Sequence, residues 1–336
     1  MKAFIIQEPM KASIVEIEKP SPKPDEVLIK VIAAGFCGTD IHTFKGEHPT
    51  IYPIIPGHEF SGIIAEVGSQ VRGFKVGDQV TADPNVFCEG CFYCKQNKQI
   101  HCENIQVVGN TRNGAFAEYV TVPEKCVFSA EGIDIIQMSM AEPLACVINA
   151  HNKVTIPVGG NVLIFGAGTI GLMHLMIAKR RGASTVTIVD LKPAQLKIAV
   201  ELGANYALAS DSNLEENLRN ISPKGFSTII DATGVPKVVE FAIPMLADTG
   251  TFLAFGACPI ESSIKINPYE IYHRDLKLIG SYALEKTMPQ SISMIGEGGF
   301  DLSPLIGQVI SFDEMPTKFN EFVNGKTNNK IIVKFD

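Results

Sequence analysis

The sequence predicts an α/β protein with two parts of different character, a β-rich part and a doubly wound part with a parallel sheet. Three observations lead to this prediction. Residues 1–150 hold many short strand-like runs separated by glycine and proline. A strand, a glycine turn, a helix and a second strand follow one another between Val162 and Asp190. Strand-like and helix-like segments then alternate to about residue 280.

Length and composition limit the possibilities further. A chain of 336 residues is typical of about two domains, and 46% hydrophobic residues are enough for sizeable cores. We expect one domain to comprise residues 1–148 and 281–336, and the other residues 149–280. The net charge of −7 argues against nucleic acid or an anionic membrane as the main partner. Met1–Met10 has no apolar targeting core, so we expect a cytoplasmic protein whose eight cysteines are metal ligands or buried thiols.

The first part of the chain reads as a series of short strands. The predicted strands are Ser13–Glu18, Glu26–Ala33, Ile63–Val67, Gln79–Ala82 and Gly114–Val122. Three prolines between residues 20 and 24 indicate a stiff loop, and glycines at 68, 73 and 77 indicate turns. Many short strands joined by glycine turns favour a partly closed barrel or roll.

Four cysteines lie within 15 residues in this part, at Cys88, Cys91, Cys94 and Cys102. Four thiolates at such spacing close a tetrahedral shell around Zn²⁺ and leave no open position, which is typical of a structural site. An iron–sulfur cluster is the competing interpretation, because closely spaced cysteines also ligate iron.

Other residues in the first part are weaker candidates when each is taken alone. Cys37 follows the strand Glu26–Ala33, and Asp40 is a candidate cap for a short helix that would favour the Cys37 thiolate. His58 and Glu59 stand at the start of another strand. Glu142 lies in an apolar helical segment, Met138–Ala150, and acids are rarely buried unless they are paired or bind a metal.

The glycine turn Gly166-Ala167-Gly168-Thr169-Ile170-Gly171 is the most informative motif of the second part. The first glycine suits a tight turn, Gly168 lets a pyrophosphate approach the backbone, and Gly171 lets the helix pack on the strand. The helix start at Thr169 and Ile170 would then offer its free N–H groups to the diphosphate. Asp190, at the end of the next strand, is placed to accept hydrogen bonds from ribose hydroxyls and to repel a 2′-phosphate. We therefore expect NAD rather than NADP.

After this motif the pattern remains α/β. The predicted elements are a helix at Leu191–Leu202, strands at Asn205–Leu208, Ser227–Asp231, Thr251–Phe255 and Leu276–Ile279, and a last strand at Lys330–Lys334. Loops at the carboxyl ends of parallel strands line the cofactor crevice in such sheets, so Thr233 and Gly256 are expected at the cofactor.

The motifs CGTDIH, GHEFSG, the four-cysteine loop, MAEPL and GAGTIG occur in this order along essentially the whole chain. Together they resemble the zinc-containing medium-chain alcohol and polyol dehydrogenases, and within them the sorbitol dehydrogenases. The resemblance implies a GroES-like catalytic domain, a Rossmann domain that binds NAD, and two zinc ions per chain. We also expect a homodimer or homotetramer that acts on a small alcohol.

The resemblance also assigns roles to single residues. Cys37 and His58 match ligands of a catalytic zinc, Glu59 matches a carboxylate at that metal, and Glu142 takes a position that is cysteine in many alcohol dehydrogenases. Thr39 and His42 match the groups that carry the proton of the substrate hydroxyl to solvent. Asp40 matches an acid that orients the zinc-binding histidine.

The substrate is less closely defined. Two carboxylates at the metal favour a polyol or sugar-derived secondary alcohol that is oxidised to a ketone. Sorbitol dehydrogenases carry an arginine near the position of Gly280, and this chain does not, which disfavours sorbitol itself. An L-threonine 3-dehydrogenase, a secondary-alcohol or diol dehydrogenase and a phosphorylated polyol remain open, the last if Arg112 or Lys286 binds phosphate. Outside the family, the alternatives are a redox-silent NAD-binding regulatory protein and a zinc hydrolase.

Overall fold

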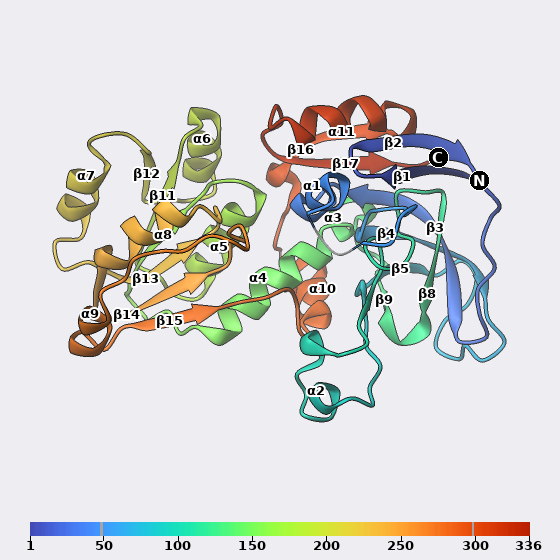
Figure 1. Cartoon of the computed structure of the whole chain (residues 1–336), viewed down its shortest axis with the longest axis horizontal. Coiled ribbons are helices and arrows are strands. Elements are labelled where there is room, and N and C mark those ends of the chain that lie inside the picture. Colours follow the sequence, from blue (N-terminus) through green and yellow to red (C-terminus); the bar gives the residue numbers. More distant parts are fainter. Residues whose placement is uncertain (48–49, 298) are drawn as a thin grey trace. The chain divides into compact units, whose positions relative to one another are not determined.

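The structure is a computed structural model that describes residues 1–47, 50–297 and 299–336. The chain forms two compact units, which Figure 1 shows together with their elements. The first unit comprises Met1–Ala145 and Leu284–Asp336, and the second comprises Cys146–Ala283. The chain thus leaves the first unit once and returns to it at Leu284.

The first unit is built on a seven-stranded sheet with the order β16-β17-β3-β4-β5-β9, in which β8 also pairs with β3. Its strands are β3 (Glu26–Gly35), β4 (Glu59–Val67), β5 (Gln79–Ala82), β8 (Tyr119–Pro123), β9 (Val127–Ser129), β16 (Ile306–Ser311) and β17 (Lys330–Lys334). Two small antiparallel sheets pair β1 (Lys2–Glu8) with β2 (Lys11–Glu16) and β6 (Asn85–Val86) with β7 (Gln106–Val107). The helices are α1 (Gly38–Lys45), α2 (Phe92–Lys95), α3 (Ile135–Met138), α10 (Met288–Gly296) and α11 (Met315–Val323).

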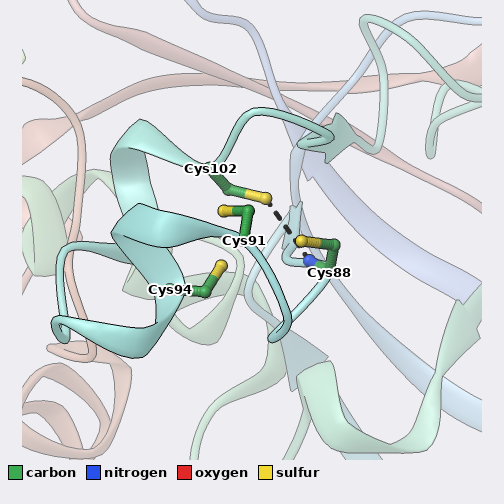
Figure 2. A group of neighbouring side chains, drawn as sticks. All are labelled: Cys88, Cys91, Cys94 and Cys102. Carbon is green, nitrogen blue, oxygen red and sulfur yellow. Dashed lines mark hydrogen bonds between the residues drawn. The ribbon is translucent and has the colours of Figure 1, made fainter.

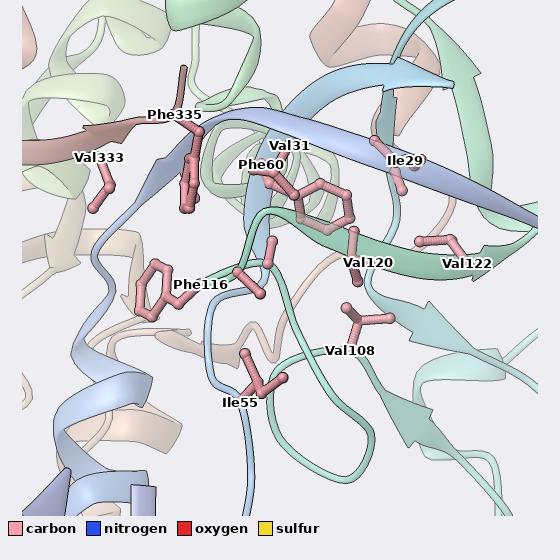
Figure 3. Close-up of a cluster of buried hydrophobic side chains, with 14 of the residues drawn as sticks. Ile29, Val31, Ile55, Phe60, Val108, Phe116, Val120, Val122, Val333 and Phe335 are labelled. Atoms are coloured by element: carbon pink, nitrogen blue, oxygen red, sulfur yellow. The ribbon is translucent and has the colours of Figure 1, made fainter. Parts of the chain in front are cut away.

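Strand β3 is the centre of this sheet, because β4, β8 and β17 all pair with it in antiparallel fashion. Most of its ten residues are buried, which explains why its sequence EVLIKVIAAG is nearly all apolar. Figure 3 shows the core beneath it, where Val31, Phe60, Phe116 and Phe335 gather from four separate segments of the chain. The first part is therefore a β-rich unit with an apolar core, as its short strands predicted.

The strand predicted at Gly114–Val122 is only half correct. Residues 114–118 form bends and an isolated bridge, and regular pairing begins at Tyr119. A side chain at Gly114 would come within 2.3 Å of the Gly57 carbonyl oxygen, so this glycine serves a close approach between two loops. Residues 114–117 are all buried, so they pack in the core without belonging to a ladder.

The second unit holds a six-stranded parallel sheet with the order β12-β11-β10-β13-β14-β15. In chain order this is 3-2-1-4-5-6, the doubly wound arrangement of dinucleotide-binding domains. The strands are β10 (Asn161–Phe165), β11 (Thr185–Asp190), β12 (Tyr206–Ala209), β13 (Phe226–Asp231), β14 (Leu246–Ala254) and β15 (Lys277–Gly280). The helices are α5 (Thr169–Arg180), α6 (Pro193–Glu201), α7 (Leu214–Ile221), α8 (Pro236–Ala242) and α9 (Pro268–His273), while α4 (Ala141–Lys153) spans the boundary in sequence.

The strand order fixes where a ligand site can form in this unit. Strands β11 and β13 lie on opposite sides of β10, so the order in which strands are added to the sheet switches sides at the carboxyl end of β10. Ligands of doubly wound sheets bind at this point. Among the described residues, no helix has the length and apolar character needed to cross a bilayer.

Candidate functional site

The turn between β3 and α1 holds the first group of candidate residues. Cys37 precedes α1 as its N-cap, and Asp40 is the third residue of the helix. Asp40 Oδ2 accepts a hydrogen bond of 2.9 Å from the backbone N–H of Cys37. Asp40 was expected as the cap itself and instead reaches back from the first turn, as the acid of a capping box does. It thereby fixes the backbone that carries the Cys37 thiol.

Strand pairing brings His58 and Glu59 to this turn. Glu59, the first residue of β4, pairs with Gly35 at the end of β3, two residues before Cys37. One ligand atom each of Cys37, His58 and Glu59 lies within 4.8 Å of the others. His58 and Glu59 are buried, and Cys37 is half-buried. A thiolate, an imidazole and a carboxylate at this spacing match the donor set of a zinc site.

Asp40 also orients the imidazole. Its Oδ1 lies 3.6 Å from His58 Nδ1 and accepts a hydrogen bond of 3.3 Å from the Gly57 N–H. This contact leaves Nε2 as the nitrogen for a metal, the arrangement in which a carboxylate sets the tautomer of a metal-binding histidine. Burial lowers the pKa of His58, but the charges of Cys37 and Asp40 outweigh burial and raise the pKa well above its usual value. The site therefore attracts a positive charge.

Three further residues were expected near this group. Thr39 Oγ1 lies 3.7 Å from Cys37 Sγ. His42 is one turn further along α1, 44% exposed, and its Nδ1 is 2.6 Å from Glu47 Oε2. Glu142 is the second residue of α4 and only 8% exposed. Glu142 is not one of the three residues within 4.8 Å, although its charge contributes to the raised pKa of Lys330, which contacts Glu59.

The cysteine loop forms a second cluster. The sulfur atoms of Cys88, Cys91, Cys94 and Cys102 all lie within 4.8 Å of one another, and Figure 2 shows the four side chains gathered together. Hydrogen bonds from the Gly90 and Cys91 backbone lower the pKa of Cys88 to about 6. Burial, together with the neighbouring thiols, raises the pKa of Cys94 to about 12. Four thiolates ionise together only around a cation, so the cluster fits a closed metal site.

The glycine turn of the second unit has the geometry that its three glycines predicted. Gly166 has φ +94° and donates a hydrogen bond to the Val189 carbonyl oxygen. A Cβ at Gly171 would lie 1.7 Å from the Gly166 carbonyl oxygen, so only glycine allows this packing of α5 on the turn. A Cβ at Gly168 would meet nothing within 4 Å, so the space over this residue is open. The turn and the N-terminus of α5 at Thr169 and Ile170 therefore fit a diphosphate.

Asp190 lies at the carboxyl end of β11 beside this turn. Its two oxygens accept hydrogen bonds from the backbone N–H groups of Ala167, at 2.6 Å, and Lys192, at 2.8 Å. Each oxygen keeps a second lone pair, so the carboxylate still has capacity for ribose hydroxyls. Asp190 thus holds the shape of the turn through these two hydrogen bonds.

The expected cofactor loops also meet at this edge. A Cβ at Gly166 would lie 3.1 Å from Thr233 Cγ2, and one at Gly256 would lie 2.1 Å from the Gly234 N–H nitrogen. Asp231, at the end of β13, accepts hydrogen bonds from the Thr233 backbone and hydroxyl. The turns after β10, β13 and β14 therefore lie side by side.

Sequence reasoning missed three residues here. Lys330 and Gly35 contact Glu59, and Asp231 organises the Thr233 turn. The lysine at the start of the otherwise apolar run KIIV was a possible signal, because charged residues are seldom placed in a buried strand without a partner. An acid immediately before Ala232-Thr233-Gly234 was a signal for a side-chain-stabilised turn.

Comparison with known families agrees with this geometry. Residues 23–132 match the alcohol dehydrogenase GroES-like domain, and residues 169–297 match the zinc-binding dehydrogenase domain.

Curated relatives match nearly the whole chain. D-altritol 5-dehydrogenase of Agrobacterium fabrum is 35% identical over 94% of each chain. D-arabinitol dehydrogenase 1 of Uromyces fabae is 31% identical over 94% of this chain and 91% of its own. L-threonine 3-dehydrogenase of Burkholderia mallei is 30% identical over 95% of each chain.

Solved structures show the same fold with either nicotinamide cofactor. A zinc-binding dehydrogenase from Sinorhizobium meliloti 1021 with bound NADP has a TM-score of 0.94 and 31% identity, covering 99% of this chain and 98% of its own. An alcohol dehydrogenase from E. coli CFT073 with NADH has a TM-score of 0.93 and 29% identity, covering 100% and 99%. The chain therefore belongs to the zinc-containing medium-chain alcohol and polyol dehydrogenases.

Proposed function

We propose that this enzyme oxidises a secondary hydroxyl of a polyol to a ketone and passes the hydride to NAD. The observation that supports this most strongly is the group of Cys37, His58 and Glu59, of which His58 and Glu59 are buried, with a second buried acid, Glu142, in the same unit. When bound at this group, zinc supplies a Lewis acid that lowers the pKa of a hydroxyl, and NAD accepts the hydride. The D-altritol and D-arabinitol dehydrogenases act on polyols, which supports the same class of substrate.

The chain's own residues would divide the work as follows. Cys37 and His58 hold the metal, and Asp40 fixes both of them through the Cys37 N–H and His58 Nδ1. Thr39 accepts the proton of the substrate hydroxyl, and the half-exposed His42 passes it to solvent.

The carboxylates favour a polyol over a simple alcohol. A polyol carries hydroxyls beside the reacting carbon, and carboxylate oxygens accept hydrogen bonds from them. A site built for such hydroxyls rejects analogues that lack them, because its buried acceptors would be left unpaired.

A phosphorylated polyol is less favoured. Arg112 Nη2 pairs with Glu26 at 2.8 Å, and Lys286 Nζ donates to Asn97 Oδ1 at 3.2 Å. Both cations that were considered for a phosphate are therefore engaged elsewhere.

Initial rates of NADH formation test the proposal. The substrates are pentitols and hexitols, their phosphates, L-threonine, vicinal diols and isopropanol. We expect the highest kcat/KM with a free polyol. A preference for L-threonine or a polyol phosphate would mean that the substrate is not a free polyol. If the enzyme turned over none of these compounds, a redox-silent NAD-binding protein would be favoured.

Cofactor choice rests on Asp190. A 2′-phosphate near its carboxylate would be repelled, so we expect a preference for NAD. The Asp190→Asn variant keeps an acceptor oxygen and removes the charge, and we expect its ratio of kcat/KM for NAD over NADP to fall about tenfold, or about 1.4 kcal/mol. Equal use of both cofactors by the wild type would refute this assignment.

We also propose that the chain forms a homodimer or homotetramer. Strand β15 is an edge of the six-stranded sheet, and Leu278 on it and Tyr282 beyond it are exposed. An unpaired edge with apolar side chains is a ready surface for a second copy. Light scattering on the purified protein would give the mass of two or four chains.

A further inference from the structure

Lys330 is a buried lysine next to the candidate metal ligands. It is 6% exposed, and its ammonium group contacts Glu59 Oε2, whose residue is 1% exposed. The same ammonium donates a hydrogen bond of 2.8 Å to the carbonyl oxygen of Phe36, the residue before Cys37. Removing a charged ammonium group from water is unfavourable unless it gains hydrogen-bond or ion-pair partners. The two contacts therefore explain how Lys330 can be buried.

The contact between Lys330 and Glu59 crosses a whole strand. Strands β17 and β4 both pair with β3, one on each side, at Gly35. A Cβ at Gly35 would lie 2.7 Å from Glu59 Oε2 and 3.0 Å from Lys330 Cε. The backbone of Gly35 is not in the left-handed region, so space and not conformation requires the glycine. The missing side chain is what lets the two charged groups meet over the central strand.

The charge of Lys330 affects the balance of charges at the candidate metal site. The ammonium group of Lys330 contacts two acceptors, Glu59 Oε2 and the Phe36 carbonyl oxygen. The acidic groups whose charges act on it are Glu59, Cys37 and Glu142. These three groups would place three negative charges in a buried site. Lys330 and a divalent ion together would balance all three.

We infer that Lys330 is a positioning residue that holds Glu59 by one carboxylate oxygen, so that Glu59 offers the metal at most one oxygen. This inference rests on the proposed zinc site. With one oxygen held, Glu59 cannot bind the metal through both oxygens and fill the position that the substrate needs. Without Lys330, Glu59 is free to do so, and its full charge would weaken the Lewis acidity of the metal.

The test uses the full-length enzyme with Co²⁺ in place of zinc, because the visible absorption of Co²⁺ reports its ligand number. We expect Lys330→Met to change the spectrum of the Cys37 site and to lower kcat about tenfold. Lys330→Arg should keep a Co²⁺ spectrum and a kcat close to those of the wild type. The matched control is Lys334→Met, which removes an exposed lysine from the same strand and should change neither.

A double-variant comparison covers the case in which Lys330→Met alone fails to fold. Lys330→Met combined with Glu59→Gln removes both charges, and we expect its Co²⁺ spectrum and kcat to equal those of Glu59→Gln alone. An unchanged spectrum in Lys330→Met, or a lysine effect that persists in the Glu59→Gln background, would overturn the inference. If the wild type binds no metal at Cys37 and His58, the proposed function fails as well; normal metal content and polyol turnover would leave that function intact.

Discussion

The two metal clusters of the first unit are assembled in opposite ways. The cysteine loop takes four like ligands from 15 consecutive residues and leaves Cys88 exposed. The other cluster takes unlike ligands from the turn after β3 and from the start of β4, buries two of them and adds a lysine counter-charge. A closed set of thiolates suits a metal that stabilises the fold, whereas a mixed set with three donors suits a metal that keeps a position open for substrate. The difference predicts that one site supports stability and the other supports chemistry.

The largest expected effect is loss of activity at the mixed site. His58→Ala removes a metal ligand, and the loss of the Lewis acid should cost several kcal/mol, about a thousandfold in kcat/KM. Steady-state kinetics with the best polyol and circular dichroism would check the result. The fold should persist, because the β3–β4 ladder does not depend on this side chain. Activity within tenfold of the wild type would contradict the assignment of the chemistry to this site.

In the cysteine loop, we expect a variant to lose stability and to keep its activity. Cys88→Ser should remove the loop metal and lower the thermal midpoint by at least about 5 °C, because metal binding at a closed site contributes to folding. At temperatures below the transition, kcat should stay within about threefold of the wild type. Cys258→Ser, in the second unit and outside both clusters, is the control. A Cys88→Ser protein with unchanged stability would remove the structural role of the loop.

A smaller effect is expected from Asp40. Asp40→Asn keeps the size of the side chain but weakens its contacts with the Cys37 N–H and with His58, and such outer contacts contribute about 10- to 100-fold to metal affinity or activity. Competition with a zinc chelator would measure the affinity. Asp313→Asn, an exposed acid paired with Lys2, is the control and should have no effect. Equal zinc affinity in Asp40→Asn and the wild type would contradict the positioning role.

The smallest effect concerns specificity. Glu142→Gln removes one buried charge, and we expect the ratio of kcat/KM for polyol over isopropanol to fall about tenfold, since one acceptor for the neighbouring hydroxyls is weakened. Zinc content, measured in parallel, separates metal loss from altered recognition. Unchanged zinc together with an unchanged ratio would place Glu142 outside the site.

Local patterns in the sequence were enough for the elements that depend on local chemistry. The four cysteines and the glycine turn carry their chemistry at fixed short spacings, and the parallel sheet of the second unit was expected from alternating strands and helices. The contact of Lys330 with Glu59 depends instead on two strand pairings across residues far apart in the chain, and no spacing encodes it. The same limit explains residues 114–118, which were predicted as part of a strand and instead pack in the core against Gly57. Glu142 shows the limit once more, because helical periodicity places it on α4 and does not say which group it faces.

The most direct test of the central claim is the zinc content of three proteins purified without chelator, each measured per chain beside its rate of polyol oxidation with NAD. We expect two zinc ions in the wild type, and one each in His58→Ala and Cys88→Ser, with the rate lost only in His58→Ala. One ion or none in the wild type, or a His58→Ala protein that keeps two ions, would contradict the assignment of chemistry and stability to separate metal sites.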